Sequence, residues 1–505
     1  MTDKSVKQPN PSPADELIRQ VPLNKSFVFL VLALPTLLSL AFGTWNDMAI
    51  PTYIVAGTIM LSPCVRVLYT EGWNGFFTAT SLVSITAYFL YCNNTIVLGD
   101  SLVSMSSHTY PVISTSVRNS AALVNLGGCS LFALGLLLTY KPRKPHAPTS
   151  FLPYGQIFVS NRALRNSIFM VTLAFVGARV GLIISAGISP IDFILGSRSS
   201  GSHLEFAGKG IALAHLANVF QVTAIMGGAL LLARKSKVRG AFMIAAFAIA
   251  TPLFFAIMRG TRSYVLGYVF ALCAFAIVIP LPRVRRIAKA LIPVILVLCG
   301  LTFALQTIYR NIGLAAAVDP ETVLSQEVDI QLGINALFAY EQSTTLELAM
   351  YLMPDRYQPL YGETLIALPV NFVPRVLWPE KPSSLGPILA DRVGVENVTL
   401  SAGLIGEGWC NFLLPGALLL PFLFGLFAGA WDRLRNLARV WPDGYALWAA
   451  GLPGLFLTVR GDFLTGGVLF MYSAIGTTLI LLSFARYRDR NNQRVVTVPG
   501  VKPTN

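Results

Sequence analysis

The sequence predicts an all-α membrane protein, a polytopic bundle of about 12 membrane-spanning helices with one large loop outside the membrane. Hydrophobic residues make up 54% of the chain and charged residues only 12%, well below the roughly 25% typical of soluble globular proteins. The mean hydropathy is +0.62. Apolar runs long enough to cross the hydrocarbon core as helices recur from one end of the chain to the other.

The predicted spans fall into two groups, one before residue 309 and one after residue 410. The first apolar run follows the polar residues 1–25 without a small-residue cleavage site, so we interpret it as a retained span and not as a removed signal peptide. The expected spans are 26–45, 50–69, 74–92, 119–140, 166–188, 210–233, 240–258, 264–282, 287–308, 411–430, 444–459 and 464–485.

Basic stretches all fall on one side of the membrane if the spans alternate, which predicts the orientation of the chain because cytoplasmic loops are rich in Lys and Arg. The basic stretches are KPRKPH (141–146), ARKSKVRG (233–240), RVRR (283–286), DRLRNLAR (432–439) and ARYRDRNNQR (485–494). The resulting segments are a cytoplasmic N-terminal tail at 1–25, spans at 26–308 and 411–485, an outer loop at 309–410, and a cytoplasmic C-terminal tail at 486–505.

The net charge of +14 is explained by the basic loops, which signal the topology and are attracted to anionic lipid heads. It therefore requires no nucleic-acid partner. The six cysteines are scattered singly and the four histidines are dispersed. The sequence therefore predicts neither a disulfide framework nor a metal site, and no cofactor.

The stretch IMRGTRSY (257–264) places Arg259 and Arg262 at the predicted outer end of two spans. These arginines are on the wrong side to act as cytoplasmic topology signals. Snorkelling of the side chains to lipid heads is one explanation. The other is an anion site, because two guanidinium groups three residues apart can face one phosphate-bearing ligand.

Four further arginines favour the anion site. Arg179 lies in the outer half of a span, where an ionisable group is costly and usually faces an interior cavity. Arg310, Arg375 and Arg460 lie at span ends or in the outer loop. Together the six arginines predict an outer binding site for a polyanion such as a pyrophosphate, although pairing with Glu407, Glu380 or Asp462 would also explain each one singly.

Two stretches supply the remaining candidate residues. In GLIGEGWCNFLLPG (403–416), Glu407 lies between glycines that allow a close approach. Glu407 is interpreted either as a general base or as the ion-pair partner of an arginine. The Pro-rich stretch ALPVNFVPRVLWPEKPSSLGP (367–387) contributes Trp378 and Glu380 as substrate-binding candidates. An aromatic ring such as Trp378 suits stacking on a sugar, and it also suits the membrane interface.

The order of these motifs resembles the bacterial oligosaccharide repeat-unit polymerases, the Wzy-type O-antigen polymerases. The resemblance rests on RGTRSY after a span, PRVLWPEKP at the end of a long outer loop, and GLIGEGWCNFLLPG at the next span. It covers about residues 250–470, and the first half of the chain matches only in hydropathy.

The resemblance implies a glycosyltransferase of the bacterial inner membrane with its active site facing the periplasm. Such enzymes transfer the growing glycan from undecaprenyl pyrophosphate to the next lipid-linked repeat unit, without a cofactor, and a chain-length regulator is an implied partner. On this reading Arg259, Arg262 and Arg310 hold the pyrophosphate, with Arg179, Arg375 and Arg460 as second choices. Glu407 is the base or an orienting carboxylate, and no histidine matches a recognisable family base position.

Two other functions remain as alternatives. An O-antigen ligase shares the architecture and the need for arginines, and only the LWPEKP and IGE matches separate it from a polymerase. A secondary transporter fits the number of spans, and LGPILADRVG (385–394) is similar to a transporter loop motif. That motif belongs in a cytoplasmic loop, however, and transporters place ionisable groups near the midplane, where Arg179 is the clear candidate.

Overall fold

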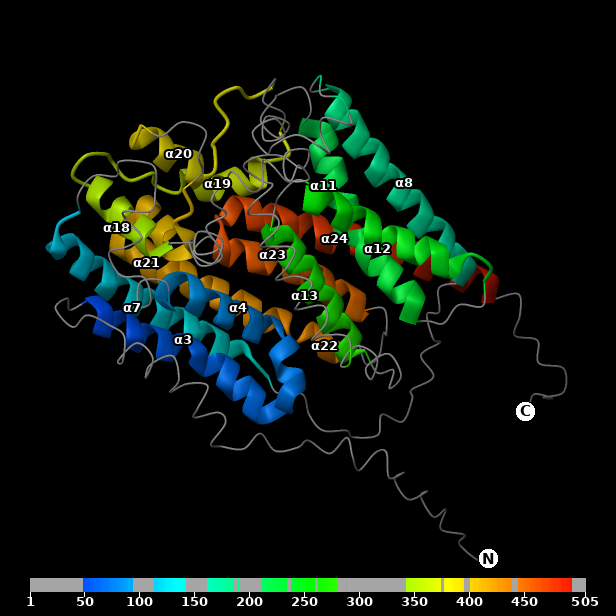
Figure 1. The fold of residues 1–505 in the computed structure, drawn as a ribbon, viewed down its shortest axis with the longest axis horizontal. Helices are drawn as coiled ribbons and strands as arrows, with labels where there is room; N and C mark the ends of the chain where they lie inside the picture. Colours follow the sequence, from blue (N-terminus) through cyan, green and yellow to red (C-terminus); the bar gives the residue numbers. More distant parts are fainter. Residues whose placement is uncertain are drawn as a thin grey trace, which may run out of the picture.

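The computed structural model describes residues 49–93, 113–141, 161–185, 211–233, 238–258, 262–279, 342–373, 377–394, 400–437 and 444–492, with single residues at 187, 189 and 290. Every regular element in these residues is a helix (Figure 1). The all-helical prediction is therefore confirmed for the described part of the chain.

The helices follow one another in the order expected from the apolar runs. Their bounds are α3 (Ala49–Glu71), η1 (Gly72–Phe77), α4 (Ala79–Tyr88), η2 (Phe89–Asn93), α7 (Thr115–Thr139), α8 (Asn161–Ser185), α11 (Ile211–Ala233), α12 (Ala241–Met258), α13 (Arg262–Val278), α18 (Gln342–Leu352), α19 (Glu363–Val370), α20 (Leu385–Arg392), α21 (Gly403–Trp431), α22 (Leu434–Leu437), α23 (Gly444–Arg460) and α24 (Phe463–Asn492).

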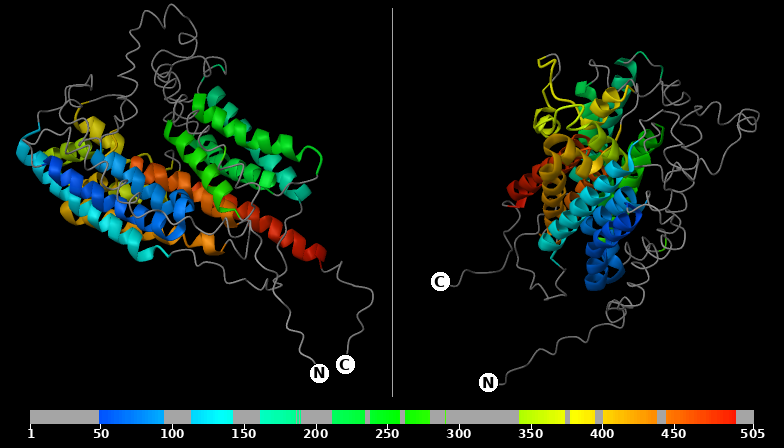
Figure 2. Two further views of the ribbon diagram at one scale, coloured as in Figure 1. Left: turned by 60° about the horizontal axis from the view of Figure 1, so that its bottom comes forward. Right: turned by 90° about the vertical axis from the view of Figure 1, so that its left-hand side faces the viewer.

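Two groups of helices pack on a shared centre (Figures 1 and 2). Helices α3, α4, α7 and α21 form one group, and α8, α11 and α12 form the other. Helices α13, α23 and α24 lie between them, since α13 packs on α23, α23 on α24, and α24 on α11. The short helices α18, α19 and α20 lie at one end of the bundle and α22 at the other (Figure 1). We call these the outer end and the inner end, after the predicted orientation.

Six of the described helices are long and apolar enough to cross a membrane. They are Ala49–Phe77, Thr115–Thr139, Arg162–Ser185, Leu213–Ala233, Ala241–Met258 and Gly403–Trp431. Shorter apolar helices cover Ala79–Cys92, Ser263–Val278 and Phe463–Leu479, and they overlap three further predicted spans. The predicted span 26–45 lies outside the described residues, and residue 290 is the one described position of the predicted span 287–308. The protein is therefore a membrane-embedded helical bundle, with six spans supported by length and composition.

One helix begins earlier than the sequence predicts. Helix α21 begins at Gly403, whereas the predicted span begins at 411. The backbone leaves the helical conformation at Phe412 and Leu413, where φ reaches 55° at Leu413, so the predicted start falls at a kink. Hydropathy detected the apolar half after the kink, and the half before it carries the glycines and polar residues of the IGE motif.

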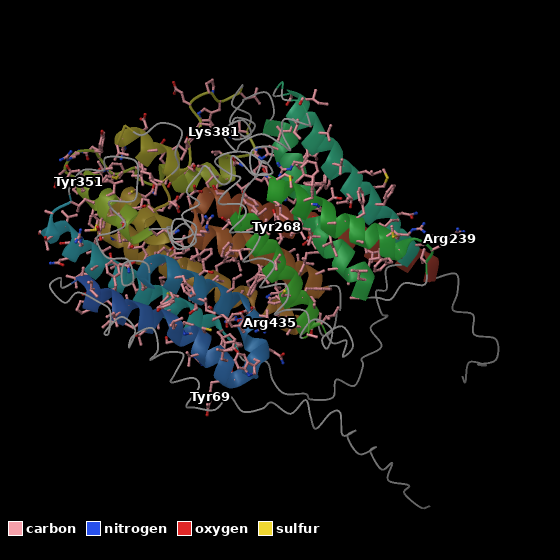
Figure 3. All side chains as sticks on the ribbon, in the orientation of Figure 1. Tyr69, Arg239, Tyr268, Tyr351, Lys381 and Arg435 are labelled. Atoms are coloured by element: carbon pink, nitrogen blue, oxygen red, sulfur yellow. The ribbon has the colours of Figure 1, made fainter. Side chains whose placement is uncertain are left out.

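The part of the outer loop that the structure describes is helical in three places. Helices α18 and α19 pack on the ends of the membrane helices: α18 contacts α7 and α21, and α19 contacts α24. Helix α20 shares a buried apolar cluster with α18. Side chains of Tyr351 and Lys381 mark this end, while Arg239 and Arg435 lie toward the opposite end (Figure 3). The segment is therefore part of the bundle and caps its outer end.

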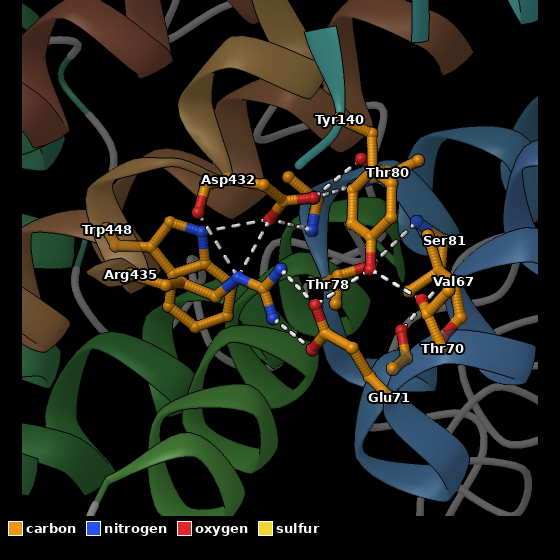
Figure 4. A network of polar contacts seen from close by, with 12 residues as sticks. Val67, Thr70, Glu71, Thr78, Thr80, Ser81, Tyr140, Asp432, Arg435 and Trp448 are labelled. Atoms are coloured by element: carbon orange, nitrogen blue, oxygen red, sulfur yellow. Dashed lines mark hydrogen bonds and ion pairs between the residues drawn. The ribbon is translucent and has the colours of Figure 1, made fainter. Parts of the chain in front are cut away.

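The inner end is held by a buried ion pair (Figure 4). The guanidinium of Arg435 donates from Nη1 and Nη2 to the two carboxylate oxygens of Glu71, at 2.9 and 3.1 Å. Its Nε lies 3.4 Å from Oδ1 of Asp432. Burial by itself would lower the pKa of Arg435, but the carboxylates of Asp432 and Glu71 outweigh it and raise that pKa. These contacts join α3 to α22.

The remaining lone pairs of these carboxylates are also used. Asp432 accepts the backbone N–H groups of Ala79 and Thr80, both at 2.8 Å, so it binds the N-terminus of α4, where negative charge is stabilising. Trp448 Nε1 donates to the same carboxylate at 3.2 Å, and the hydroxyl of Tyr140 donates to Glu71 at 2.8 Å. This saturated network ties α3, α4, α7, α22 and α23 together at the inner end.

Candidate functional site

The predicted residue Glu407 lies at the outer end with no exposed surface. Its Oε1 accepts a hydrogen bond from the hydroxyl of Thr364 at 2.8 Å, and its Oε2 accepts the backbone N–H of Phe463 at 2.6 Å. Because Phe463 is the first residue of α24, the carboxylate lies at a helix N-terminus, where the positive end of the helix dipole favours it. Glu407 thus connects α21 with α19 and α24.

Asn411 completes the same cluster from one helical turn further along α21. Its amide nitrogen donates to Thr364 Oγ1 at 2.7 Å and to the Glu407 carbonyl at 2.8 Å, while its amide oxygen accepts the Gly362 N–H at 3.0 Å. Residues four apart share a helix face. The spacing E-x-x-x-N of the IGE motif therefore has a physical basis, since both side chains hold the start of α19.

The glycines of the motif allow two parts of α21 to touch across its kink. A Cβ on Gly408 would overlap the carbonyl of Gly416, and a Cβ on Gly416 would overlap the carbonyl of Gly408. Any larger side chain at either position would push the two halves of the helix apart. The kink in turn carries the half-helix with Glu407 and Asn411 toward α18 and α19.

Asp462 lies beside this cluster in the turn between α23 and α24. Its Oδ1 accepts the Thr465 N–H at 2.6 Å, which makes it the N-cap of α24. The side chain is half-buried, and burial raises the pKa of its carboxyl above the ordinary value, against hydrogen bonds from Thr465 and Ser384 that lower it. Asp462 also lies within electrostatic range of Glu407. Two carboxyl groups therefore share one helix N-terminus.

The turn that carries Arg460 is fixed by its backbone. The hydroxyl of Ser401 lies 2.7 and 2.8 Å from the carbonyls of Arg460 and Gly461, and the amide of Gln342 also donates to the Arg460 carbonyl. The hydroxyl of Tyr91 donates to the Val459 carbonyl at 2.8 Å. These hydrogen bonds fix the backbone of Arg460 at the outer end, in the turn that also carries Gly461 and Asp462.

The first residue of α13, Arg262, is placed at the outer end by the packing of its helix. Gly267 of α13 packs on Pro453 and Phe456 of α23, one turn before Arg460. Phe270, further along α13, stacks on Phe77 toward the inner end, with ring centroids 5.9 Å apart. Helix α13 thus runs from the outer to the inner end, and its N-terminus lies at the same end as Arg460.

Arg179 of α8 lies near the start of α13. Its guanidinium is within electrostatic range of Tyr264 and Tyr268 of that helix. It donates to Asn218 and Gln221 of α11 at 3.2 and 3.1 Å. The described residues therefore place Arg179, the backbone of Arg262 and Arg460 toward the end of the bundle that carries Glu407, and a shared arginine site stays a prediction.

Other candidates are placed apart or are not described. Trp378 and Glu380 are exposed and are not joined to the Glu407 cluster by the contacts of the described residues. Arg259, Arg310 and Arg375 lie outside the described residues, and the structure describes only the backbone of Arg262. Glu407 makes no ion pair with a described arginine, so the described contacts do not support its predicted role as an ion-pair partner. They suit the orienting carboxylate that the resemblance implies, and the role of general base stays a prediction.

Sequence reasoning missed three functional candidates. Thr364 had no local signal, because its contact with Glu407 spans 43 residues of chain. His215 and Tyr472 lie inside apolar helices, where only their polarity marks them, and they meet at 2.6 Å. In the part of the chain that is described, no three His, Cys, Asp or Glu side chains form a metal-binding group.

Comparison with known proteins adds no relative to this picture. No family model, no curated protein and no solved structure matches the chain.

Proposed function

We propose that the protein is a membrane glycosyltransferase that polymerises lipid-linked oligosaccharide repeat units. It would act in a bacterial inner membrane, with its outer end facing the periplasm. The growing glycan would move from undecaprenyl pyrophosphate to the next lipid-linked repeat unit, for example in the synthesis of O-antigen lipopolysaccharide. The partners would be membrane lipid, the lipid-linked oligosaccharide and a chain-length regulator.

The observation that carries this proposal is the gathering of arginines and carboxyl groups at one end of the bundle. Arg179, Arg262 and Arg460 lie at the outer end, and Glu407 and Asp462 lie at the same end. A pyrophosphate leaving group gains negative charge as the glycosidic bond breaks. Fixed guanidinium groups sheltered from water stabilise that charge.

The roles follow from charge and exposure. Arg259, Arg262 and Arg310 would bind the pyrophosphate directly, with Arg179, Arg375 and Arg460 around them. Trp378 and Glu380, which are exposed on the segment between α19 and α20, would contact the glycan. Glu407 would act as a positioning residue, because both of its oxygens are engaged and it has no exposed surface.

Proton transfer from the acceptor hydroxyl needs a base that substrate can reach. Asp462 meets this need better than Glu407, since it is half-buried and lies in the turn after Arg460. Burial raises the pKa of its carboxyl, which brings the group closer to the operating pH, where general bases act best. Such a base typically contributes on the order of 10²–10⁴-fold to the rate.

Deletion and complementation test the proposal. Cells that lack the protein should carry surface glycan of single repeat units, and wild-type protein should restore the ladder of longer chains on a gel. Loss of all glycan attached to lipid A, including single units, would indicate a ligase instead. A normal ladder in the deletion strain would refute both.

A further inference from the structure

Lys381 belongs to the LWPEKP stretch, but the proposed function gives it no role. Only 6% of its surface is exposed. Its ammonium group donates to the backbone carbonyls of Asn371 and Val373, both at 3.0 Å. Both acceptors lie just past the last residue of α19, where the negative end of the helix dipole favours a cation. Lys381 is therefore an anchor between its own segment and the end of α19.

The anchored segment is the turn that carries the glycan candidates. The backbone N–H of Lys381 donates to the carbonyl of Trp378 at 3.2 Å, which closes a β-turn. Pro379 has the second position of this turn, which proline favours. Trp378 is 40% exposed and Glu380 is exposed as well, so both side chains are open to solvent while the lysine beside them is buried.

Helix α19 connects this anchor to the buried carboxylate of the candidate site. Near the start of the helix, Thr364 donates to Glu407 at 2.8 Å, and the Gly362 N–H donates to Asn411 at 3.0 Å. The helix has 8 residues and is therefore about 12 Å long. Glu407 and Lys381 thus hold opposite ends of one short helix.

Two further contacts fix the surroundings of the turn on α24. Ser384, four residues after Glu380, hydrogen-bonds to the carboxyl group of Asp462. The ring of Phe372 packs edge-on against Tyr472 of α24, with centroids 5.4 Å apart, and the side chain of Asn371 hydrogen-bonds with the same tyrosine. The segment after the turn therefore reaches the proposed base, and the carbonyls that hold Lys381 are themselves docked.

We propose that Lys381 is a positioning residue for glycan recognition. It holds the turn of Trp378 and Glu380 in place, in the segment that contacts Asp462, so that these two side chains bind a sugar of the lipid-linked repeat unit. An indole ring offers a large apolar face to a sugar ring, and a carboxylate accepts hydrogen bonds from sugar hydroxyl groups. The inference rests on the proposed function and adds the residue that organises its glycan contacts.

Preorganisation explains how a residue that does not touch the glycan changes its affinity. A segment that moves freely before binding must be ordered on binding, and that ordering weakens the affinity. Loss of the two bonds of Lys381 should therefore weaken glycan binding by about tenfold. Binding of the pyrophosphate should not change, because Arg259, Arg262 and Arg310, which are assigned to it, lie on other segments.

Two lipids that differ only in the glycan test this role. The full-length protein in phosphatidylcholine nanodiscs is titrated with the undecaprenyl-pyrophosphate-linked repeat unit or with undecaprenyl pyrophosphate, and affinity is taken from the rise in unfolding temperature. Lys381→Met should bind the first lipid about tenfold more weakly than the wild type and the second equally well. Equal weakening for both lipids, or unchanged binding of the first, would overturn the inference.

Two other variants control for charge and for folding. Lys381→Arg keeps a cation that can donate to the same carbonyls, so it should bind the glycan-bearing lipid more tightly than Lys381→Met. Arg356→Met removes an exposed cation from another outer turn and should bind both lipids like the wild type. If Lys381→Met is absent from the membrane, Lys381→Gln, which keeps one donor group, replaces it with the same expected direction. Glycan binding by Lys381→Arg as weak as that of Lys381→Met would contradict the anchor.

A double-mutant cycle tests whether the lysine acts through the turn. Trp378→Ala should weaken binding of the glycan-bearing lipid by itself. Adding Lys381→Met to it should cause little further loss, because the ring that the lysine positions is already gone. Fully additive losses would show that Lys381 acts elsewhere and would overturn the inference.

Polymer formation is measured apart from binding, so the two proposals fail separately. A protein that binds the glycan through Lys381 but makes no longer chain would refute the polymerase and support the recognition turn. Chain growth with the same KM for the lipid-linked unit in Lys381→Met and wild type would support the polymerase and overturn the inference.

Discussion

The two ends of the bundle hold their buried charges in opposite ways. At the inner end the carboxylates of Glu71 and Asp432 face the guanidinium of Arg435. At the outer end Glu407 and Asp462 lie near each other at a helix N-terminus, and Arg179 is bonded only to neutral amides among the described residues. The inner end neutralises its charges within the protein. At the outer end Arg118 and Glu347 also pair, at 3.9 Å, but Glu407, Asp462 and Arg179 make no ion pair among the described residues.

This difference separates structural from functional polar groups. A charge that is paired and fully hydrogen-bonded has no capacity left for a ligand, so the inner cluster holds helices together. A buried polar group with an unused hydrogen-bond donor or acceptor destabilises the ligand-free protein. Such a group is kept where a ligand forms the missing hydrogen bond. The outer end is therefore the place to look for substrate, and the inner end is the place to look for stability.

The largest effect is expected at the inner end. Arg435→Ala would leave Glu71 and Asp432 buried without their cation, a change that typically costs about 3–5 kcal/mol. Most of the variant should be lost from the membrane, as measured by its amount in membrane fractions and its unfolding temperature. Arg433→Ala is the control, because Arg433 is exposed and, among the described residues, donates to the Thr139 carbonyl. Similar levels of both variants would contradict a structural role for the cluster.

Arginine variants at the outer end should reduce activity and not abundance. Arg262→Ala, and separately Arg259→Ala, should lower glycan elongation on the order of 10²–10³-fold, as for loss of one donor to a developing anion. Glycan length on a gel and protein level in the membrane are measured together. Arg165→Ala at the inner end should elongate normally. Ladders of normal length from both outer variants would exclude these arginines from the site.

A smaller effect is expected for the carboxylate that positions the site. Glu407→Ala removes the acceptor for Thr364 and for the Phe463 N–H, which should cost about 1–3 kcal/mol for each buried group left unsatisfied. Glu407→Gln keeps one acceptor oxygen and should cost less. Glu363→Gln, an exposed change in the first turn of α19, controls for lost charge. Equal unfolding temperatures for wild type and Glu407→Ala would refute the positioning role.

The smallest effect is a pH dependence at Asp462. Its carboxyl has a raised pKa in the folded protein, so the folded state binds a proton more readily than the unfolded state. Stability contributed by this group is therefore greatest at low pH and falls as the pH rises from the ordinary value of 3.8 through the raised value. The difference in unfolding temperature between acidic and neutral pH should be smaller in Asp462→Asn. If Asp462→Asn showed the same difference in unfolding temperature as the wild type, the raised pKa of Asp462 would be contradicted.

Much of the fold follows from hydropathy alone. Helices such as α7, α8 and α11 match the predicted spans because a run of apolar residues about 20 long can satisfy its backbone hydrogen bonds in lipid only as a helix. The start of α21 was missed because its first half, Gly403 to Asn411, interrupts its apolar residues with three glycines and with Glu407 and Asn411. Its helical form depends on contacts with α18 and α19, which no local pattern contains.

The candidate site was predictable in composition but not in geometry. The sequence marked Glu407 and the outer arginines, because charges are conspicuous in an apolar chain. It could not reveal that Thr364 and Phe463 occupy both oxygens of Glu407, since these contacts join residues 43 and 56 positions apart. For the same reason, the pairing of His215 with Tyr472, 257 positions away, became visible only in three dimensions.

Reconstitution tests the assignment of the outer end most directly. The purified protein in proteoliposomes is supplied with an undecaprenyl-pyrophosphate-linked repeat unit, and the products are separated by length. The wild-type protein should form glycans of two or more repeat units and release undecaprenyl pyrophosphate. Arg262→Ala should abolish both products. Movement of the lipid-linked unit or another solute across the membrane without any longer glycan would show a transporter and contradict the proposed function.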